Sequence, residues 1–117
     1  MSASAFSLSS LYRAERFEII QGETVRGGRK SGPSHQFCAS CMSWMFTIPE
    51  KLTEFVNVRS SMLEDGRAHR PYVDMFRAEG FGWAQTGAPR VFDAAADLDD
   101  FPAVLEEYSQ WNGRVTE

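Results

Sequence analysis

The sequence predicts a mainly β protein that folds as one domain and closes with a short helix. Short apolar segments separated by Gly, Pro and polar turn residues fill the chain up to its last quarter, where a helical period begins. With 117 residues, 43% of them hydrophobic and 13% aromatic, the chain can build one core but not two. We therefore expect residues 1–117 to form a single domain.

The two central strands of the expected sheet are the segments 44–47 and 55–59. The first is strongly apolar and ends before Pro49, and the second alternates apolar with polar residues and contains two valines. The other expected strands are the segments 5–12, 17–20, 35–38 and 72–76. The polar stretch 60–70 is expected as a loop.

One amphipathic helix is expected near the C-terminus, on apolar residues spaced i, i+3, i+4 and i+7: Phe101, Val104, Leu105 and Tyr108. Pro102 lies where the first helical turn tolerates proline. Asp99 or Asp100 can cap the free N–H groups at the helix start. The acidic C-terminal quarter is therefore interpreted as a solvated helix face.

Charge and composition exclude several classes of protein. The net charge is −4, so a generic nucleic-acid partner is not expected. Two cysteines are too few for the disulfide framework of a small secreted domain, which indicates a reducing compartment. Since no apolar run approaches the length of a membrane span, we expect a soluble, cytoplasmic protein with no membrane partner.

The sharpest local motif is the pair Cys38 and Cys41, three positions apart in a turn between apolar segments. This spacing can direct two sulfurs at one zinc ion, but a structural zinc site needs four ligands. His35 and His69 are weak candidates for the missing ligands, and His35 is more readily read as a surface residue of an edge strand. Two small buried residues and a redox pair remain alternative readings of the cysteines.

Other candidate site residues have plainer interpretations. The aromatic residues Phe6, Phe37, Trp44, Phe46 and Phe55 are expected in the core rather than on a ligand platform. Trp83, flanked by small residues in a loop, is a better candidate for a contact residue. The basic cluster 26–30 is read as a solvated loop that could also meet an anion.

Several segments together carry a resemblance to a known family: Ser4 to Phe6, Phe17 to Gly22, Phe37 to Phe46, Phe55 to Arg59 and Met62 to Asp65. In order and spacing they resemble the glutathione-dependent formaldehyde-activating enzyme family, also called the centromere protein V-like family. The resemblance implies a β-tent of packed antiparallel sheets and two zinc sites. It also implies a carbon–sulfur lyase that condenses a glutathione-type thiol with formaldehyde to S-(hydroxymethyl)glutathione.

The carry-over of the family's zinc ligands is incomplete. By resemblance, Cys38 and Cys41 are ligands of the structural zinc, but the Cys-x-Cys that completes that site is absent from this sequence. The Cys-x-Cys-x-x-Cys of the catalytic zinc, which precedes a segment like 2–6, is absent as well. We expect an N-terminally truncated or late-started relative, inactive as this chain. The alternative is a non-catalytic module or homodimer in which two chains share one zinc through Cys38 and Cys41.

Overall fold

The computed structural model describes residues 3–114, and its backbone divides into two compact units, Met1–Gly66 and Arg67–Glu117. The described residues form seven strands, one α-helix and four short 3-10 turns. The mainly β fold class and the single C-terminal helix are thus confirmed. The expectation that the units fold together as one domain stays a prediction, as does the β-tent arrangement.

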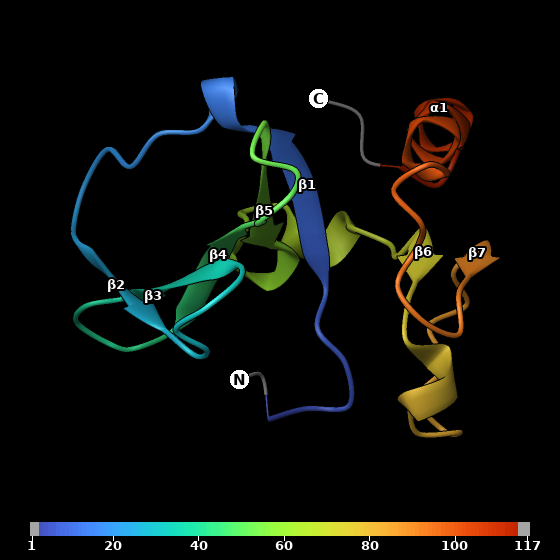
Figure 1. Ribbon diagram of the computed structural model, residues 1–117, viewed down its shortest axis with the longest axis horizontal. Helices are drawn as coiled ribbons and strands as arrows, with labels where there is room; N and C mark the ends of the chain where they lie inside the picture. The colour runs from blue at the N-terminus through green and yellow to red at the C-terminus, as the bar shows by residue number, and fades with distance from the viewer. Residues whose placement is uncertain (1–2, 115–117) are drawn as a thin grey trace. The chain divides into compact units, whose positions relative to one another are not determined.

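The first unit is built on one antiparallel sheet of five strands in the order β1-β5-β4-β3-β2. Strand direction rotates strongly from β1 to β2, as sheet twist requires (Figure 1). The expected strands at 35–38, 44–47 and 55–59 correspond to the three interior strands. The elements of this unit are β1 (Ser9–Arg13), the 3-10 turn Ala14–Arg16, β2 (Thr24–Gly27), β3 (Ser34–Cys38), β4 (Trp44–Ile48), β5 (Phe55–Arg59) and the 3-10 turn Ser60–Met62.

The expected strand at 17–20 is wrong, and the sheet order explains why. Strands β1 and β2 occupy opposite edges, so the chain between them has to cross the whole sheet and cannot pair with it. Phe17 packs its ring on Phe46 of the middle strand at 4.8 Å between centroids, while Ile20 is 86% exposed. The apolar side chains of this segment therefore cover a sheet face instead of extending it.

The core of the first unit lies on the interior strands. Phe46, Phe55 and Val56 are buried, together with the polar residue Ser60. The Ser60 hydroxyl shares a 2.7 Å hydrogen bond with that of Ser10, which satisfies both groups away from water. Phe6 was expected in this core but is 53% exposed, because it precedes the first strand and joins no sheet.

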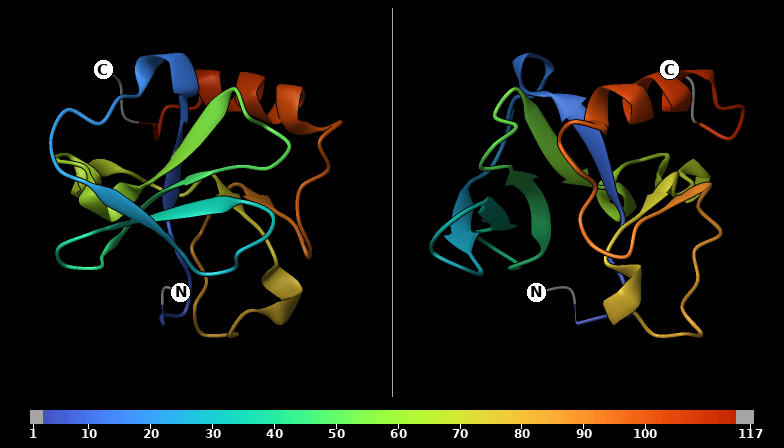
Figure 2. Two further views of the ribbon diagram at one scale, coloured as in Figure 1. Left: turned by 60° about the vertical axis from the view of Figure 1, so that its left-hand side comes forward. Right: turned by 45° about the vertical axis from the view of Figure 1, so that its right-hand side comes forward.

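The second unit consists of two short strands, two 3-10 turns and the helix. Strands β6 and β7 pair in parallel, and backbone hydrogen bonds from Phe92 to Asp74 and from Phe76 to Ala94 extend the contact. Strand β6 falls inside the expected segment 72–76, but β7 was not predicted, because two residues show no period. The elements, also visible in Figure 2, are η3 (Gly66–Ala68), β6 (Val73–Asp74), η4 (Arg77–Glu79), β7 (Arg90–Val91) and α1 (Phe101–Gln110).

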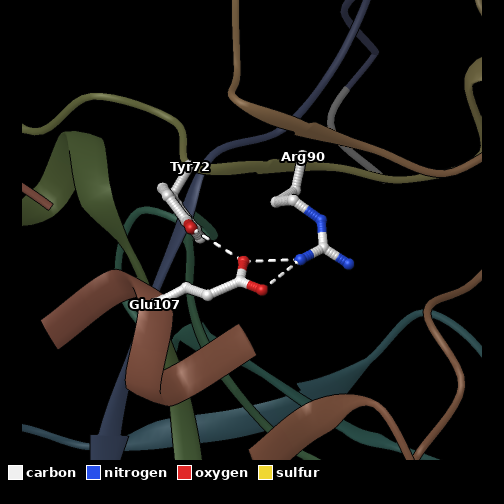
Figure 3. A network of polar contacts seen from close by, with 3 residues as sticks. All are labelled: Tyr72, Arg90 and Glu107. Carbon is white, nitrogen blue, oxygen red and sulfur yellow. Dashed lines mark hydrogen bonds and ion pairs between the residues drawn. The ribbon is translucent and has the colours of Figure 1, made fainter. Parts of the chain in front are cut away.

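Helix α1 is fastened to the strand pair by one carboxylate. Glu107 accepts hydrogen bonds from Arg90 at 2.6 Å and from the Tyr72 hydroxyl at 3.0 Å (Figure 3). The Arg90 hydrogen bond, followed by that of Tyr72, holds the pKa of Glu107 below its usual value. Tyr72 also contacts the rings of Tyr108 and Trp111, at 5.6 and 5.1 Å between centroids. These contacts fix the helix against the segment that enters β6.

The start of α1 differs in detail from the expected cap. Asp100 occupies the N-cap position, but its side chain makes no capping hydrogen bond. Instead the Asp97 carboxylate accepts from the N–H of Asp99 at 3.1 Å, one turn earlier. Pro102 lies in the first turn, as expected. Within residues 3–114, no helix has both the length and the apolar character needed to cross a bilayer.

Candidate functional site

The turn that links β3 to β4 holds both cysteines. The Cys38 N–H donates to the Ser43 carbonyl and the Met42 N–H donates to the Cys38 carbonyl, each at 2.9 Å. These two bonds close a tight loop whose last corner is Met42, in the left-handed region with φ +61°. Glycine adopts this conformation without strain, whereas methionine does not. The backbone is therefore held in a demanding shape directly after the second cysteine.

The geometry of this turn brings the two thiols together. Cys41 is exposed, and its sulfur lies 3.2 Å from the Ser43 hydroxyl oxygen. Hydrogen bonds from the Ser43 side chain and backbone, and then from the Cys38 side chain, lower the pKa of Cys41. The thiolate is the form that binds metals and attacks electrophiles. The turn thus presents a solvent-accessible sulfur with increased thiolate character beside a second one.

Two sulfurs supply half of a tetrahedral zinc site. Among residues 3–114, no group of three or more His, Cys, Asp and Glu side chains is placed to hold a metal ion. His35 does not join the cysteines, because its Nδ1 lies 2.8 Å from the Thr47 hydroxyl oxygen. The described residues therefore fit zinc only in part, with Cys38 and Cys41 as two donors and further donors needed from elsewhere.

His35 is a half-buried residue of an interior strand, not a surface residue of an edge. It lies in β3, which is flanked by β2 and β4, and pairs directly with Thr47. Burial and the neighbouring Arg26 charge lower the pKa of His35. Its ring meets that of Trp44 edge-on at 5.4 Å between centroids, and the Trp44 Nε1–H donates to the same Thr47 oxygen at 3.1 Å.

Arg59 belongs to the same sheet face and was missed as a candidate site residue. Its guanidinium carbon lies 4.2 Å from the centre of the Trp44 ring, and its Nη1 is buried without a hydrogen-bond partner. Burial lowers the pKa of Arg59. The alternation in 55–59 could have indicated that Arg59 and Asn57 share a face. It could not have indicated that the charge is desolvated there.

The opposite face of the sheet carries an open hollow of about 430 Å³. Gln36 and Thr24 form its polar wall and are joined by a 2.9 Å hydrogen bond, while the rest of the lining is mainly apolar. Residues 17–19, which cross the sheet between β1 and β2, form one side of this hollow although they form no strand. The lining consists of Phe17, Glu18, Ile19, Thr24, Gln36, Phe46 and Ile48.

Trp83 lies in the second unit, in an exposed loop. It is 78% exposed and stacks on Phe81, with 5.5 Å between ring centroids and 20° between the planes. Trp83 is therefore accessible to a partner, and its role as a contact residue stays a prediction. It brings Trp83 together with another exposed aromatic ring rather than with a polar group.

Comparison with family models connects the cysteine turn to a known family. Residues 1–79, which include the whole sheet and the Cys38–Ser43 turn, match the model described as glutathione-dependent formaldehyde-activating enzyme. The chain belongs to the glutathione-dependent formaldehyde-activating enzyme family. This confirms the resemblance stated above. Searches against curated proteins and against solved structures returned no match.

Both cysteines lie inside the region that matches the glutathione-dependent formaldehyde-activating family. The matched region covers the sheet, the turn and Arg59, and ends at Glu79. The expected ligands Cys38 and Cys41 are neighbours in space. Their role as zinc ligands stays a prediction.

Proposed function

We propose that this protein is a zinc-binding member of its family that recognises a glutathione-type thiol adduct and belongs to the carbon–sulfur lyase type. The observation that carries the proposal is the family match over residues 1–79, which contains the turn with its paired thiols. The net charge of −4 and the two free cysteines support a cytoplasmic protein without a nucleic-acid partner.

Cys38 and Cys41 are the proposed zinc ligands. The lowered pKa of Cys41 favours the charged form that a zinc ion requires, and the two backbone hydrogen bonds of the turn preorganise both sulfurs. When bound with an open position, zinc supplies a Lewis acid that can hold a substrate thiol as thiolate. The chain's own contribution is to fix two sulfurs and keep one of them accessible.

We propose further that this chain alone does not catalyse adduct formation. Its two cysteines cannot provide both a structural pair and a separate set of three thiolates. The test mixes zinc-supplied protein with glutathione and formaldehyde and follows S-(hydroxymethyl)glutathione by NMR. The expected rate equals that of the uncatalysed addition. A protein-dependent acceleration that is lost in Cys38→Ser would overturn the proposed inactivity.

Glutathione recognition is tested separately from catalysis, by isothermal titration of the purified chain. Saturable binding supports the substrate class, and its absence up to millimolar glutathione contradicts it. Zinc content after gel filtration, measured on the same samples, tests the ligand assignment. The Cys38→Ser variant is expected to lose the metal, whereas Ser40→Ala, a matched change of an exposed residue in the same turn, retains it.

The alternative is a module in which two chains share one zinc. It is favoured by the exposure of Cys41, which leaves the sulfur pair open to ligands from a second copy. Four thiolates from two symmetric chains would complete a tetrahedral site. Native mass spectrometry decides the question: one zinc per dimer supports sharing. A metal-free monomer rejects it, and one zinc per monomer indicates ligands from another source.

A further inference from the structure

The guanidinium of Arg59, at the end of β5, is partly removed from water. Its Nη1 is buried and has no hydrogen-bond partner. The residues that face it across the strands by register are uncharged, Ser9 directly opposite on β1 and Asn57 two positions along β5. Leaving one guanidinium N–H out of water without a partner is unfavourable. A buried polar group left in this state calls for a ligand that completes it.

The surroundings of Arg59 hold the guanidinium in a fixed orientation. It lies over the Trp44 ring at 4.2 Å, a distance at which the cation and the ring attract each other. Trp44 is itself held by the hydrogen bond from its Nε1 to Thr47 and by stacking with Phe37, 6.4 Å away at 25°. These contacts come from three adjacent strands, β3, β4 and β5. The stacked pair of Arg59 and Trp44 is thus part of the sheet rather than of a loop.

His35 adds polarity to this face without supplying a counter-charge. Its ring contacts Trp44 and shares the Thr47 hydroxyl with it. Burial, followed by the neighbouring Arg26 charge, lowers the pKa of His35 and so disfavours its charged form. Histidine carries no negative charge in either protonation state, so it supplies no counter-charge for Arg59.

We propose that Arg59, laid over Trp44, is a carboxylate-binding subsite of this protein. A planar guanidinium whose face is covered by an aromatic ring leaves its N–H edge for a planar anion, and a carboxylate accepts two such bonds in parallel. The proposal rests on the proposed function in one respect, because it assigns the carboxylate to a glutathione-type tripeptide. The subsite would orient the carboxylate end of the thiol adduct.

The test uses S-methylglutathione, whose blocked sulfur cannot be deprotonated, so that binding does not report thiolate ligation of a metal. Titration of the wild-type chain is compared with Arg59→Gln, Arg59→Lys and the control Arg13→Gln. Arg13 also lies over an aromatic ring of the sheet, that of Phe55 at 5.3 Å, but it is exposed. The diethyl ester of the same probe removes both carboxylates.

We expect Arg59→Gln to weaken binding by about tenfold or more, the usual loss for a charge-assisted hydrogen bond. Arg59→Lys should lose less affinity, since lysine keeps the positive charge but lacks the planar set of N–H donors of a guanidinium. The ester should bind the wild type as weakly as the acid binds Arg59→Gln, and Arg13→Gln should bind like the wild type. Equal binding by wild type and Arg59→Gln overturns the subsite, whether or not glutathione is the substrate.

A second ligand separates failure of the subsite from failure of the proposed substrate. If succinate stabilises the wild type in an Arg59-dependent way but S-methylglutathione does not bind, the subsite stands and the glutathione assignment fails. If no carboxylate binds at millimolar concentration, the subsite itself is rejected. Arg59→Met provides the folding control, because it should melt no lower than the wild type while failing to bind.

Discussion

The left-handed corner at Met42 allows a quantitative test of how the cysteine turn is held. A residue with a Cβ costs about 1–2 kcal/mol in this region, and Met42 has φ +61°. Replacing it with glycine removes that strain but gives the unfolded chain more freedom, which costs about 0.4–1 kcal/mol. Little packing is lost, because the Met42 side chain is 58% exposed. Met42→Gly should therefore raise the free energy of unfolding by about 0.5–1 kcal/mol.

The measurement is urea denaturation of the wild type and three variants, with thermal melting as a second readout. A gain of this size corresponds to a rise in Tm of roughly 2–5 °C for a chain of this length. Met42→Ala keeps the Cβ and removes the rest, so it should match the wild type within about 0.5 kcal/mol. Met42→Val places a β-branched residue at positive φ and should destabilise by about 1 kcal/mol or more.

The order glycine, then methionine and alanine, then valine is what the backbone explanation requires. If Met42→Gly were less stable than Met42→Ala, the strain would be negligible and the turn would depend on the methionine side chain. Alkylation of Cys41 by iodoacetamide gives a further check. Because glycine retains the N–H that donates to Cys38, the thiol environment and the rate of alkylation should be unchanged in Met42→Gly.

Four further changes test the packing and electrostatics. Gly66→Ala would place a Cβ 2.5 Å from a backbone carbonyl oxygen, so it should destabilise by about 1–3 kcal/mol in urea denaturation. Gly82→Ala, which meets nothing within 4 Å, should stay within about 0.5 kcal/mol of the wild type. Glu107 has a folded pKa below its unfolded value, chiefly through Arg90, so its contribution is complete above the unfolded pKa and is lost as the pH falls through the folded pKa. Glu107→Gln should therefore reduce the acid dependence of Tm, and an unchanged pH profile would contradict this role. In the absence of ligand, Arg59→Met should raise the free energy of unfolding by up to about 1 kcal/mol, because removing a half-buried cation with one unpartnered N–H more than offsets the lost ring contact. A large decrease would mean that Arg59 is structural.

The parts of the fold that the sequence could predict are those fixed by local pattern. Strands β3, β4 and β5 and helix α1 all follow from spacing, and the pairing of Cys38 with Cys41 follows from the length of a turn. The segment 17–20 has the composition of a strand. Whether it pairs with the sheet depends on which edges β1 and β2 occupy. That is a property of the whole sheet, and no window of sequence contains it.

The candidate site divides in the same way. Both thiols could be named in advance because their relation is local, separated by two residues of one turn. Arg59 could not, because its significance comes from Trp44 on the neighbouring strand and from the burial of its Nη1 without a hydrogen-bond partner. The exposure and pairing of a charged side chain depend on strands that are distant in sequence. The sequence therefore shows that an arginine is present but not that its guanidinium is partly buried.

One short run of sequence, from Ser43 to Phe46, connects the two proposed sites. Ser43 supports the Cys41 sulfur, Trp44 carries the Arg59 guanidinium, and Phe46 packs in the core against Phe17. Each of these side chains leaves β4, or the turn before it, toward a different environment. If both proposed sites are real, substitutions at Ser43, Trp44 and Phe46 should separate three effects: on thiol geometry, on anion recognition and on sheet packing, respectively.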